Sequence, residues 1–296
     1  MLTVLALLGV GVVAGRWSRV PDGSARVLDA FVVNVALPGL VIALVPRLEF
    51  DPEVAVPVAV AWGTLVVAAL AVLALSRVLR WSRAVTGTLL LVVPLGNTSF
   101  LGIPAVEQLL GPGHVPYAII YDQLGSFLAL ATYGAVIAGV YGRASRPRLG
   151  RVLLRVVSFP PFAALVVAVV LAATGVPELV ADVSDRLGST VTPLAMIAVG
   201  MRVAIPRRFG ALVPLTAALG LRLVALPALV YGIGEVVALS GVAWQTSVLE
   251  AAMPPMVTAS IIAIDAGLDE ELAANAVGAG VLLSMLTLPL WSGLIT

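Results

Sequence analysis

The sequence predicts an all-α polytopic membrane protein, with ten transmembrane helices arranged as two inverted repeats of five. Three observations predict this fold. Hydrophobic residues make up 60% of the 296-residue chain and charged residues only 11%, whereas soluble domains are nearer to about 45–50% and about 25%. Apolar runs recur along the whole chain, separated by short loops that leave no room for an extramembrane domain. Proline-containing interruptions of these runs recur at a nearly constant offset.

Each span needs about 20 mostly apolar residues. The N-terminal run is interpreted as a first span and not as a signal peptide, because its first basic residue, Arg16, follows the apolar stretch. The ten spans are expected at residues 1–17, 25–46, 53–78, 85–110, 114–142, 152–174, 178–204, 209–238, 243–266 and 270–295.

The arginines indicate the orientation of the chain. All 17 basic residues are arginine. With the N-terminus outside, Arg47 and Arg186 fall outside, and Arg222 falls within the eighth span, where we expect it to face protein or water. The positive-inside rule therefore predicts a cell-membrane protein with both termini outside the cytoplasm. The 14 arginines on the cytoplasmic side are Arg16, Arg19, Arg26, Arg77, Arg80, Arg83, Arg143, Arg146, Arg148, Arg151, Arg155, Arg202, Arg207 and Arg208.

The interruptions of the apolar runs suggest an internal repeat. Pro38 in the second span and Pro193 in the seventh are 155 positions apart, and each follows a polar residue. Pro94 in the fourth span and Pro254 in the ninth are 160 positions apart. A repeat of five spans is odd, so the second copy enters the membrane from the opposite side. Inverted repeats with discontinuous helices are typical of secondary transporters, whose substrate site lies near the midplane. The alternative is that these are ordinary kinks, which membrane helices tolerate.

The repeat divides the chain into residues 1–145 and 146–296. The fourth-span break, "VPLGNTS", supplies the candidate substrate-binding residues Pro94, Asn97 and Thr98. The Asn97 amide offers two donors and an acceptor, and the N-termini of half-helices favour a carboxylate. Asn97 alternatively caps the second half-helix. Ser99 is a second-rank candidate on the same surface.

The ninth-span break, "EAAMPPMVTAS", adds Met253, Pro254 and Pro255 to the candidate substrate-binding residues. Prolines remove backbone donors and push the preceding residue out of helical geometry, which leaves carbonyl groups free to coordinate a cation. A bare kink is the alternative. Asn34, beside the second-span proline, completes the candidate substrate-binding set.

Ionisable residues inside the spans are candidates for coupling transport to a proton or cation. Asp122, Ser126 and Tyr133 are predicted to share one face of the fifth span and to point into the bundle. Asp122 is a proton or cation ligand, a structural hydrogen-bond acceptor or an interfacial group. Glu250, one turn before the ninth-span break, is a second candidate, with Arg222 or a proton as its partner. Arg222 is the third candidate.

Several function classes are excluded or disfavoured. The absence of cysteine excludes disulfides and cysteine-ligated metal. His114 lies in a Gly-Pro-Gly-His-Val-Pro turn, and Glu107 and Glu235 are expected at the membrane interface. No cofactor, metal or nucleic acid is predicted, and no phosphate-binding loop is visible. A channel, or a permease subunit dependent on a separate ATPase, is an alternative. An intramembrane enzyme would need paired acid and base groups that the sequence lacks.

The strings "FVVNVALPGL", "GNTSFLGIPAVEQLLGPG", "AIIYDQLGS", "TPLAMIAVGM" and "AAMPPMVTASIIAIDAGLDEEL" carry a resemblance that covers essentially the whole chain. In their order and spacing the chain resembles the auxin efflux carrier family, which includes plant auxin carriers and bacterial organic-anion permeases.

The resemblance implies that helices 4 and 9 cross at their breaks, with Pro94 and Pro254 at the crossing and Asn97 in contact with the substrate. It implies a scaffold of helices 1, 2, 6 and 7 that forms a homodimer, and a transport domain of helices 3–5 and 8–10. It also implies small organic anions as substrates, such as malate or auxin-like acids, and matches Asp122 to an acidic position of bacterial members. The connection "RASRPRLGR" is much shorter than the loop of the plant carriers, which speaks against auxin itself. Uniport, proton coupling and sodium coupling stay open.

Overall fold

The computed structural model describes residues 2–48, 52–142, 149–202 and 212–296. These residues form helices and connections without a β-strand, and their one strand-like contact is an isolated antiparallel bridge between Gly96 and Pro255. The prediction of an all-α fold is therefore confirmed.

Five helical stretches of the described chain are long and apolar enough to cross a membrane. They coincide with the predicted second, third, fifth, eighth and tenth spans. Shorter apolar helices occupy parts of the predicted first, fourth and sixth spans. Several such helices identify the chain as a membrane protein. The five long stretches are Ser24–Arg47, Pro52–Leu79, Pro112–Tyr141, Leu212–Val237 and Glu270–Ile295.

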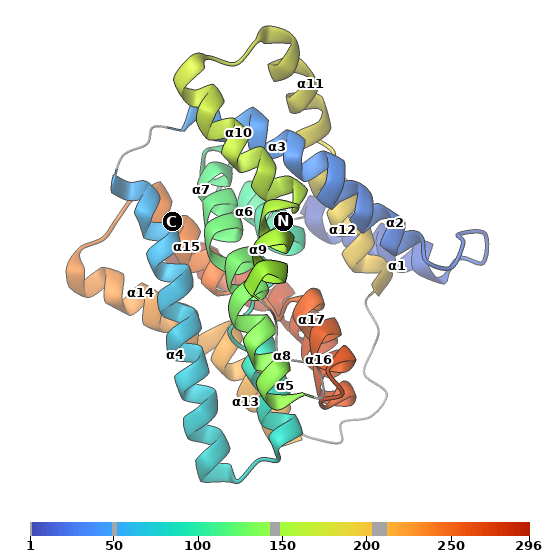
Figure 1. The fold of residues 1–296 in the computed structure, drawn as a ribbon, viewed down its shortest axis with the longest axis vertical. Helices are drawn as coiled ribbons and strands as arrows, with labels where there is room; N and C mark the ends of the chain where they lie inside the picture. Colours follow the sequence, from blue (N-terminus) through green and yellow to red (C-terminus); the bar gives the residue numbers. More distant parts are fainter. Residues whose placement is uncertain (1, 49–51, 143–148, 203–211) are drawn as a thin grey trace.

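The helices follow one another along the chain as Figure 1 draws them, with η denoting a 3-10 or π turn. The first elements are α1 (Leu2–Arg16), α2 (Ser24–Phe31), η1 (Val32–Ala36), α3 (Leu37–Leu44), η2 (Val45–Arg47), η3 (Pro52–Val54), α4 (Ala55–Leu79), α5 (Arg83–Val92), η4 (Thr98–Gly102), α6 (Ile103–Leu109), η5 (Pro112–His114), α7 (Val115–Ile120), η6 (Tyr121–Phe127), η7 (Leu130–Gly134) and α8 (Ala135–Tyr141). They are followed by α9 (Leu149–Val157), α10 (Pro160–Thr174), α11 (Glu178–Gly188), α12 (Val191–Arg202), α13 (Leu212–Gly220), η8 (Leu221–Ala225), α14 (Leu226–Val237), α15 (Val242–Ala251), α16 (Val257–Asp265) and α17 (Glu270–Ile295).

Three of the π turns have a common cause in the sequence. η1, η4 and η8 each end two residues before a proline, namely Pro38, Pro104 and Pro227. In each case the residue just before the proline donates its N–H to the carbonyl five positions back. A proline has no N–H, and its ring crowds the carbonyl four positions back, so a widened turn accommodates it within a continuing helix.

One group of helices packs at one side of the molecule. It comprises α12, which contacts both α1 and α2, and α3, which contacts α10 and α11 (Figure 1). Two ion pairs tie this group together, because Arg47 Nη2 lies 2.7 Å from Asp185 Oδ2 and Arg202 pairs with Asp29.

A second group of helices packs around α5 and α17. It includes α4, α13, α14, α15 and α16, and it has its own buried apolar cluster. Side chains link its elements through hydrogen bonds, since Tyr133 Oη donates to Leu90 O at 2.8 Å and Trp291 Nε1 donates to Leu223 O at 2.9 Å.

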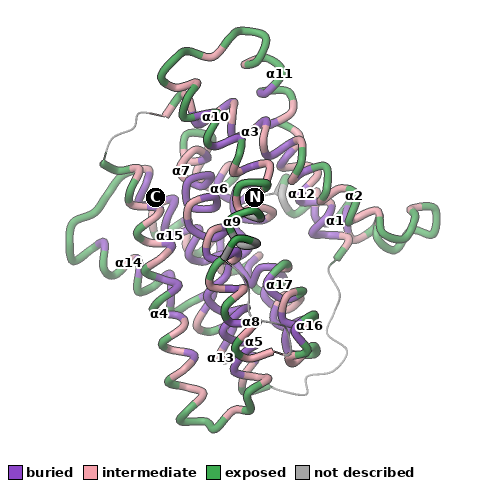
Figure 2. Tube along the Cα trace, in the orientation of Figure 1, coloured by how far each residue is buried: buried purple, intermediate pink, exposed green. Residues whose placement is uncertain are grey.

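The distribution of polar and apolar side chains is the one expected for a protein surrounded by lipid. Large apolar side chains point outward on the peripheral helices, including Val78 at 77% exposure, Val236 at 86% and Leu290 at 68%. Figure 2 shows the buried residues concentrated on the central segments. Fully buried polar side chains, such as Arg222 and Glu250, lie in this centre. An apolar exterior around a polar interior is expected where the solvent is lipid.

Parts of several predictions lie outside the described residues. The boundary between the two predicted halves, at residues 145 and 146, is one of them, as are most of the arginine-rich connection and part of the loop after α12. The arginines concerned are Arg143, Arg146, Arg148, Arg207 and Arg208.

Candidate functional site

Two non-helical segments meet at the centre of the molecule. The chain leaves helical geometry between α5 and η4, and again between α15 and α16. The Asn97 N–H donates to Pro254 O at 2.8 Å, and the Met256 N–H donates to Leu95 O at 2.9 Å. These two bonds join the segments side by side in antiparallel fashion. Because Pro254 has no N–H, its carbonyl is the only backbone group that it can contribute.

Arg222, which belongs to a third element, donates hydrogen bonds to both of these segments. Its side chain, only 1% exposed, extends from η8. Nε donates to Met253 O at 2.7 Å, and Nη1 donates to Pro94 O at 3.4 Å. A Cβ atom at Gly96 would collide with the guanidinium group. Gly96 is therefore required for this close approach, and Arg222 satisfies carbonyl groups that helical hydrogen bonds no longer reach.

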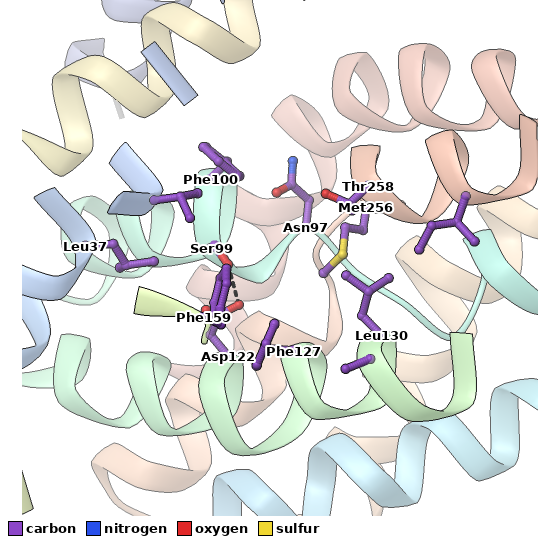
Figure 3. Close-up of a pocket in the computed structure, with 13 residues that line it drawn as sticks. Leu37, Asn97, Ser99, Phe100, Asp122, Phe127, Leu130, Phe159, Met256 and Thr258 are labelled. Carbon is purple, nitrogen blue, oxygen red and sulfur yellow. Dashed lines mark hydrogen bonds between the residues drawn. The ribbon is translucent and has the colours of Figure 1, made fainter. Parts of the chain in front are cut away.

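A cavity of about 330 Å³ lies beside the joined segments. Its walls are mostly apolar, with four polar side chains among them. Figure 3 shows Met256 and Thr258 near Asn97, with Ser99 and Asp122 on the opposite part of the wall. A mostly apolar cavity of this size with a few polar groups is typical of a small-molecule site. The lining residues are Val33, Leu37, Asn97, Ser99, Phe100, Asp122, Phe127, Leu130, Ala131, Phe159, Met256, Thr258 and Ile262.

Asp122 is held by three side-chain donors. Oδ1 accepts from Thr98 Oγ1 at 2.5 Å and from Ser99 Oγ at 2.6 Å, and Oδ2 accepts from Gln123 Nε2 at 2.7 Å. The Asp122 side chain is only 1% exposed. It is a structural acceptor that fixes η4 to η6 and at the same time lines the cavity.

The Asn97 side chain is the one buried donor of the cavity wall without a partner. The residue is 2% exposed, and its Nδ2 makes no hydrogen bond. It occupies the N-cap position of η4 but makes no side-chain capping bond there. The capping alternative is therefore not realised in this structure. Buried polar groups are nearly always hydrogen-bonded, so this amide is free to donate to an acceptor that enters the cavity.

Glu250 is a buried carboxylate that does not line the cavity. It is completely buried in the last turn of α15, and neither carboxylate oxygen has a hydrogen-bond partner. The carboxylate packs against Gly102, where an added Cβ would collide with it. Its electrostatic neighbours are Asp122 and Arg222. Arg222, its predicted partner, is near enough to act on its charge but is bonded to carbonyl groups instead.

Other candidate residues lie outside the cavity lining. Asn34 is exposed, and its Nδ2 donates to Ala30 O at 2.7 Å. The structure therefore does not bring Asn34 to the other candidates. Residues of the two breaks contribute backbone carbonyls or the contact with Asp122, and they do not line the cavity. These residues are Pro94, Thr98, Met253 and Pro254. Pro255, which is bridged to Gly96, also lies outside the lining.

Two residues expected at turns or interfaces make specific contacts. Glu107 is half-buried and accepts a hydrogen bond from Thr192 Oγ1 at 2.5 Å, which joins α6 to α12. His114 Nε2 forms a 3.1 Å hydrogen bond with Gln245 Oε1. Glu235 is exposed. No group of three or more potential metal ligands occurs among the described residues.

The sequence reasoning missed the aromatic wall of the cavity. Phe127 and Phe159 stack with ring centroids 3.9 Å apart and planes at 14°. Phe100 and Leu130 extend the same apolar lining. No sequence signal separates these side chains from the other apolar residues of a chain so rich in them. Gln123 was also missed, although its neighbour Asp122 was selected.

The fold and this site define a helical membrane protein with a buried polar centre beside a mostly apolar cavity. The family described as membrane transport protein matches residues 1–292. The chain belongs to this family, which confirms the resemblance to the auxin efflux carrier family.

Two archaeal relatives align with almost the whole chain. An uncharacterized transporter of Methanothermobacter thermautotrophicus is 29% identical over 297 residues, covering 99% of this chain and 96% of the relative. An uncharacterized transporter of Methanocaldococcus jannaschii is 25% identical over 302 residues, covering 98% and 96%. The family and the relatives thus identify the chain as a membrane transporter. They favour this class over the alternative of an intramembrane enzyme.

Proposed function

We propose that this protein is a secondary transporter that moves small organic anions, such as malate or auxin-like carboxylates, by alternating access. The substrate binds in the cavity beside the joined segments. The observation that carries the proposal is the unpartnered Asn97 Nδ2, which is buried at the wall of a 330 Å³ cavity. A substrate oxygen supplies the acceptor that this donor lacks.

The start of α16 supports an anionic substrate. Thr258, the second residue of α16, lines the cavity, so the first turn of this helix contributes to the wall. First-turn N–H groups have no partners within the helix, and the dipole favours negative charge there. Asp122 would oppose an anion, but three donors already occupy its oxygens. The apolar wall suits the carbon skeleton of a carboxylate.

We also propose that the two interrupted segments belong to broken membrane-crossing helices, α5–α6 and α15–α16, within a ten-span inverted repeat. The bridged residues Gly96 and Pro255 are 159 positions apart, close to the sequence offset of 160. Corresponding segments that pair antiparallel are expected from a two-fold axis in the membrane plane.

The position of the cavity between two helix groups supports alternating access. Val33, Leu37 and Phe159 come from the part of the chain that forms the first group, the proposed scaffold. The remaining lining residues come from η4, the η6–η7 region and α16, in the proposed transport domain. Relative movement of the groups would open the cavity to either side. The scaffold helices are the proposed homodimer surface.

We propose that the protein is located in the cell membrane, with both termini outside the cytoplasm. Because the chain has no cysteine, single cysteines report their side of the membrane without background labelling. A membrane-impermeant thiol reagent applied to intact cells should label Thr296→Cys and should leave Trp81→Cys, in the proposed cytoplasmic loop, unlabelled. The reverse pattern would overturn the orientation.

The test of function is uptake of a panel of labelled carboxylates into proteoliposomes. We expect saturable uptake of at least one acid, with a loss of tenfold or more in Asn97→Ala. Asn34→Ala is the matched control, because it removes the same side chain from an exposed position outside the cavity. Equal uptake by wild type and Asn97→Ala would refute the assigned site. Folded protein that transports none of the acids would refute the substrate class.

A further inference from the structure

Glu250 is a buried carboxyl group that the proposed substrate site does not use. It is fully buried, does not line the cavity, and receives no hydrogen bond at either oxygen. It packs against Gly102, the last residue of η4, so it touches the element that also carries Thr98 and Ser99.

The surroundings of Glu250 favour the neutral, protonated carboxyl group in this conformation. An ionised carboxylate without donors loses its hydration and gains no hydrogen bond in return. Glu250 also lies in the last turn of α15, where the carbonyl end of the helix disfavours negative charge. The proton is therefore the ligand that this position accommodates.

The ionisable groups that face Glu250 come from two neighbouring elements. Arg222 extends from η8, and Tyr121 and Asp122 belong to η6. Glu107 and His114, on the adjacent α6 and η5, are bonded to Thr192 and Gln245. Of the groups that face Glu250, Arg222 is the one cation, and it is bonded to Met253 O and Pro94 O.

We infer that Glu250 is a proton-binding site, and that its protonation state controls whether Arg222 stays hydrogen-bonded to the two joined segments. With Glu250 protonated, the guanidinium donates to the carbonyls of both segments. When the proton leaves to water, the carboxylate becomes the stronger acceptor, because charge-assisted hydrogen bonds exceed those to neutral carbonyls. Arg222 then turns toward Glu250, and the joined segments lose the hydrogen bonds that Arg222 donates to them.

This inference deepens the proposed function, on which its coupling role rests. A proton bound at Glu250 would stabilise the joined segments beside the substrate cavity, and its release would loosen them. Proton binding and the arrangement of the substrate site are thereby linked by one arginine. The proton site itself is testable without any substrate.

The first test is infrared spectroscopy of the purified protein during a pH titration. We expect a carbonyl band of a buried protonated carboxylic acid, lost in Glu250→Gln and retained in the matched variant Asp122→Asn. A band that persists in Glu250→Gln, or its absence from the wild type, would overturn the proton site.

The second test is hydrogen exchange of the joined segments, residues 93–102 and 252–258, as a function of pH. After correction for intrinsic exchange, wild-type protection should fall several-fold as Glu250 ionises. Glu250→Gln, which cannot ionise, should stay protected across the same range. The same pH response in both proteins would overturn the control of Arg222 by Glu250.

Uptake of labelled malate and of the other carboxylates of the panel then separates this inference from the proposed function. If the wild type transports an acid and a pH gradient stimulates it, the stimulation should be lost in Glu250→Gln. Stimulation that is unchanged in Glu250→Gln would overturn the coupling role and leave the transporter standing. If no carboxylate is transported, the infrared and exchange results still decide whether Glu250 binds the proton.

Discussion

The backbone of Asn97 is bound to Pro254, 157 positions away in the chain, while its side-chain amide is unbound. The N–H to carbonyl distance of 2.8 Å fixes the position of Asn97 in the joined segments. Its Nδ2 is then held at the cavity wall without a partner. One residue therefore combines a rigid backbone with a free donor, which is the arrangement that preorganised binding requires.

Gly96→Ala should destabilise the protein, because its Cβ would strike the Arg222 guanidinium. Overpacking of a filled interior costs about 1–3 kcal/mol. Displacement of Arg222 would also free the carbonyls of Met253 and Pro94. Thermal unfolding of the detergent-purified variant measures the loss.

Gly232→Ala is the matched control for this prediction. Gly232 lies in helix α14, and an added Cβ meets nothing within 4 Å. Replacement of a helical glycine by alanine is neutral or stabilising by up to about 1 kcal/mol. Equal unfolding temperatures for Gly96→Ala and wild type would contradict the close packing of Arg222 on Gly96.

Ser99→Ala should weaken the support of Asp122. Ser99 Oγ is one of two donors to Oδ1, at 2.6 Å. Loss of a hydrogen bond to a charged group costs about 1.5–3 kcal/mol, measured as the free energy of unfolding. Thr216→Ala is the control, because the Thr216 hydroxyl is exposed and bonds only within its own helix.

A double-mutant cycle checks the origin of that loss. In the Asp122→Asn background, Ser99→Ala should cost less, since the charged acceptor is gone. An identical cost in both backgrounds would show that Ser99 stabilises the protein independently of Asp122.

Proline positions were informative about the centre of the molecule, because proline acts on its own backbone wherever it stands. The spacing of Pro94 and Pro254 located the two segments that meet there. The spacing could not reveal Arg222 as their common donor, because that contact joins η8 to residues far away in the chain. The sequence predicted that Arg222 would face protein or water, with Glu250 as one candidate partner, but not that it would bond to these carbonyl groups.

The contacts of the fifth predicted span agree with part of its side-chain prediction. Asp122, Ser126 and Tyr133 were expected on one face that points into the bundle. Asp122 bonds to Thr98 and Ser99 and Tyr133 bonds to Leu90 O, so both contact the predicted fourth span, and Ser126 is buried. Asn34, which lies in η1, was selected by its place beside a proline, and it is exposed.

Phe159→Ala should change substrate size selectivity. The ring of Phe159 stacks on Phe127 and lines the cavity. Its removal enlarges the cavity on the apolar wall, so an aromatic carboxylate should gain relative to a short dicarboxylate. A difference of about 1–3 kcal/mol, or roughly 10–200-fold, is typical of pocket size discrimination. Competition uptake in proteoliposomes measures the ratio.

Phe162→Ala controls for loss of aromatic packing without a change in the cavity. Phe162 also contacts Phe127, at a centroid distance of 6.2 Å, but it does not line the cavity. Its selectivity should match that of the wild type. The same shift in both variants would assign the effect to packing around Phe127 and contradict a specificity role for Phe159.

Cross-linking of α6 to α12 should stop transport, because α6 belongs to the proposed transport domain as part of the broken helix α5–α6, and α12 belongs to the proposed scaffold. Thr192 Oγ1 and Glu107 Oε2 lie 2.5 Å apart, so Thr192→Cys with Glu107→Cys lets a short bifunctional thiol reagent join them. The chain has no native cysteine to interfere.

Arg47→Cys with Asp185→Cys is the matched pair within the first group, where an ion pair already joins α11 to the end of the second predicted span. We expect the first cross-link to abolish uptake reversibly and the second to leave it intact. Full uptake by protein cross-linked at 107 and 192 would rule out relative movement of these helices during the transport cycle.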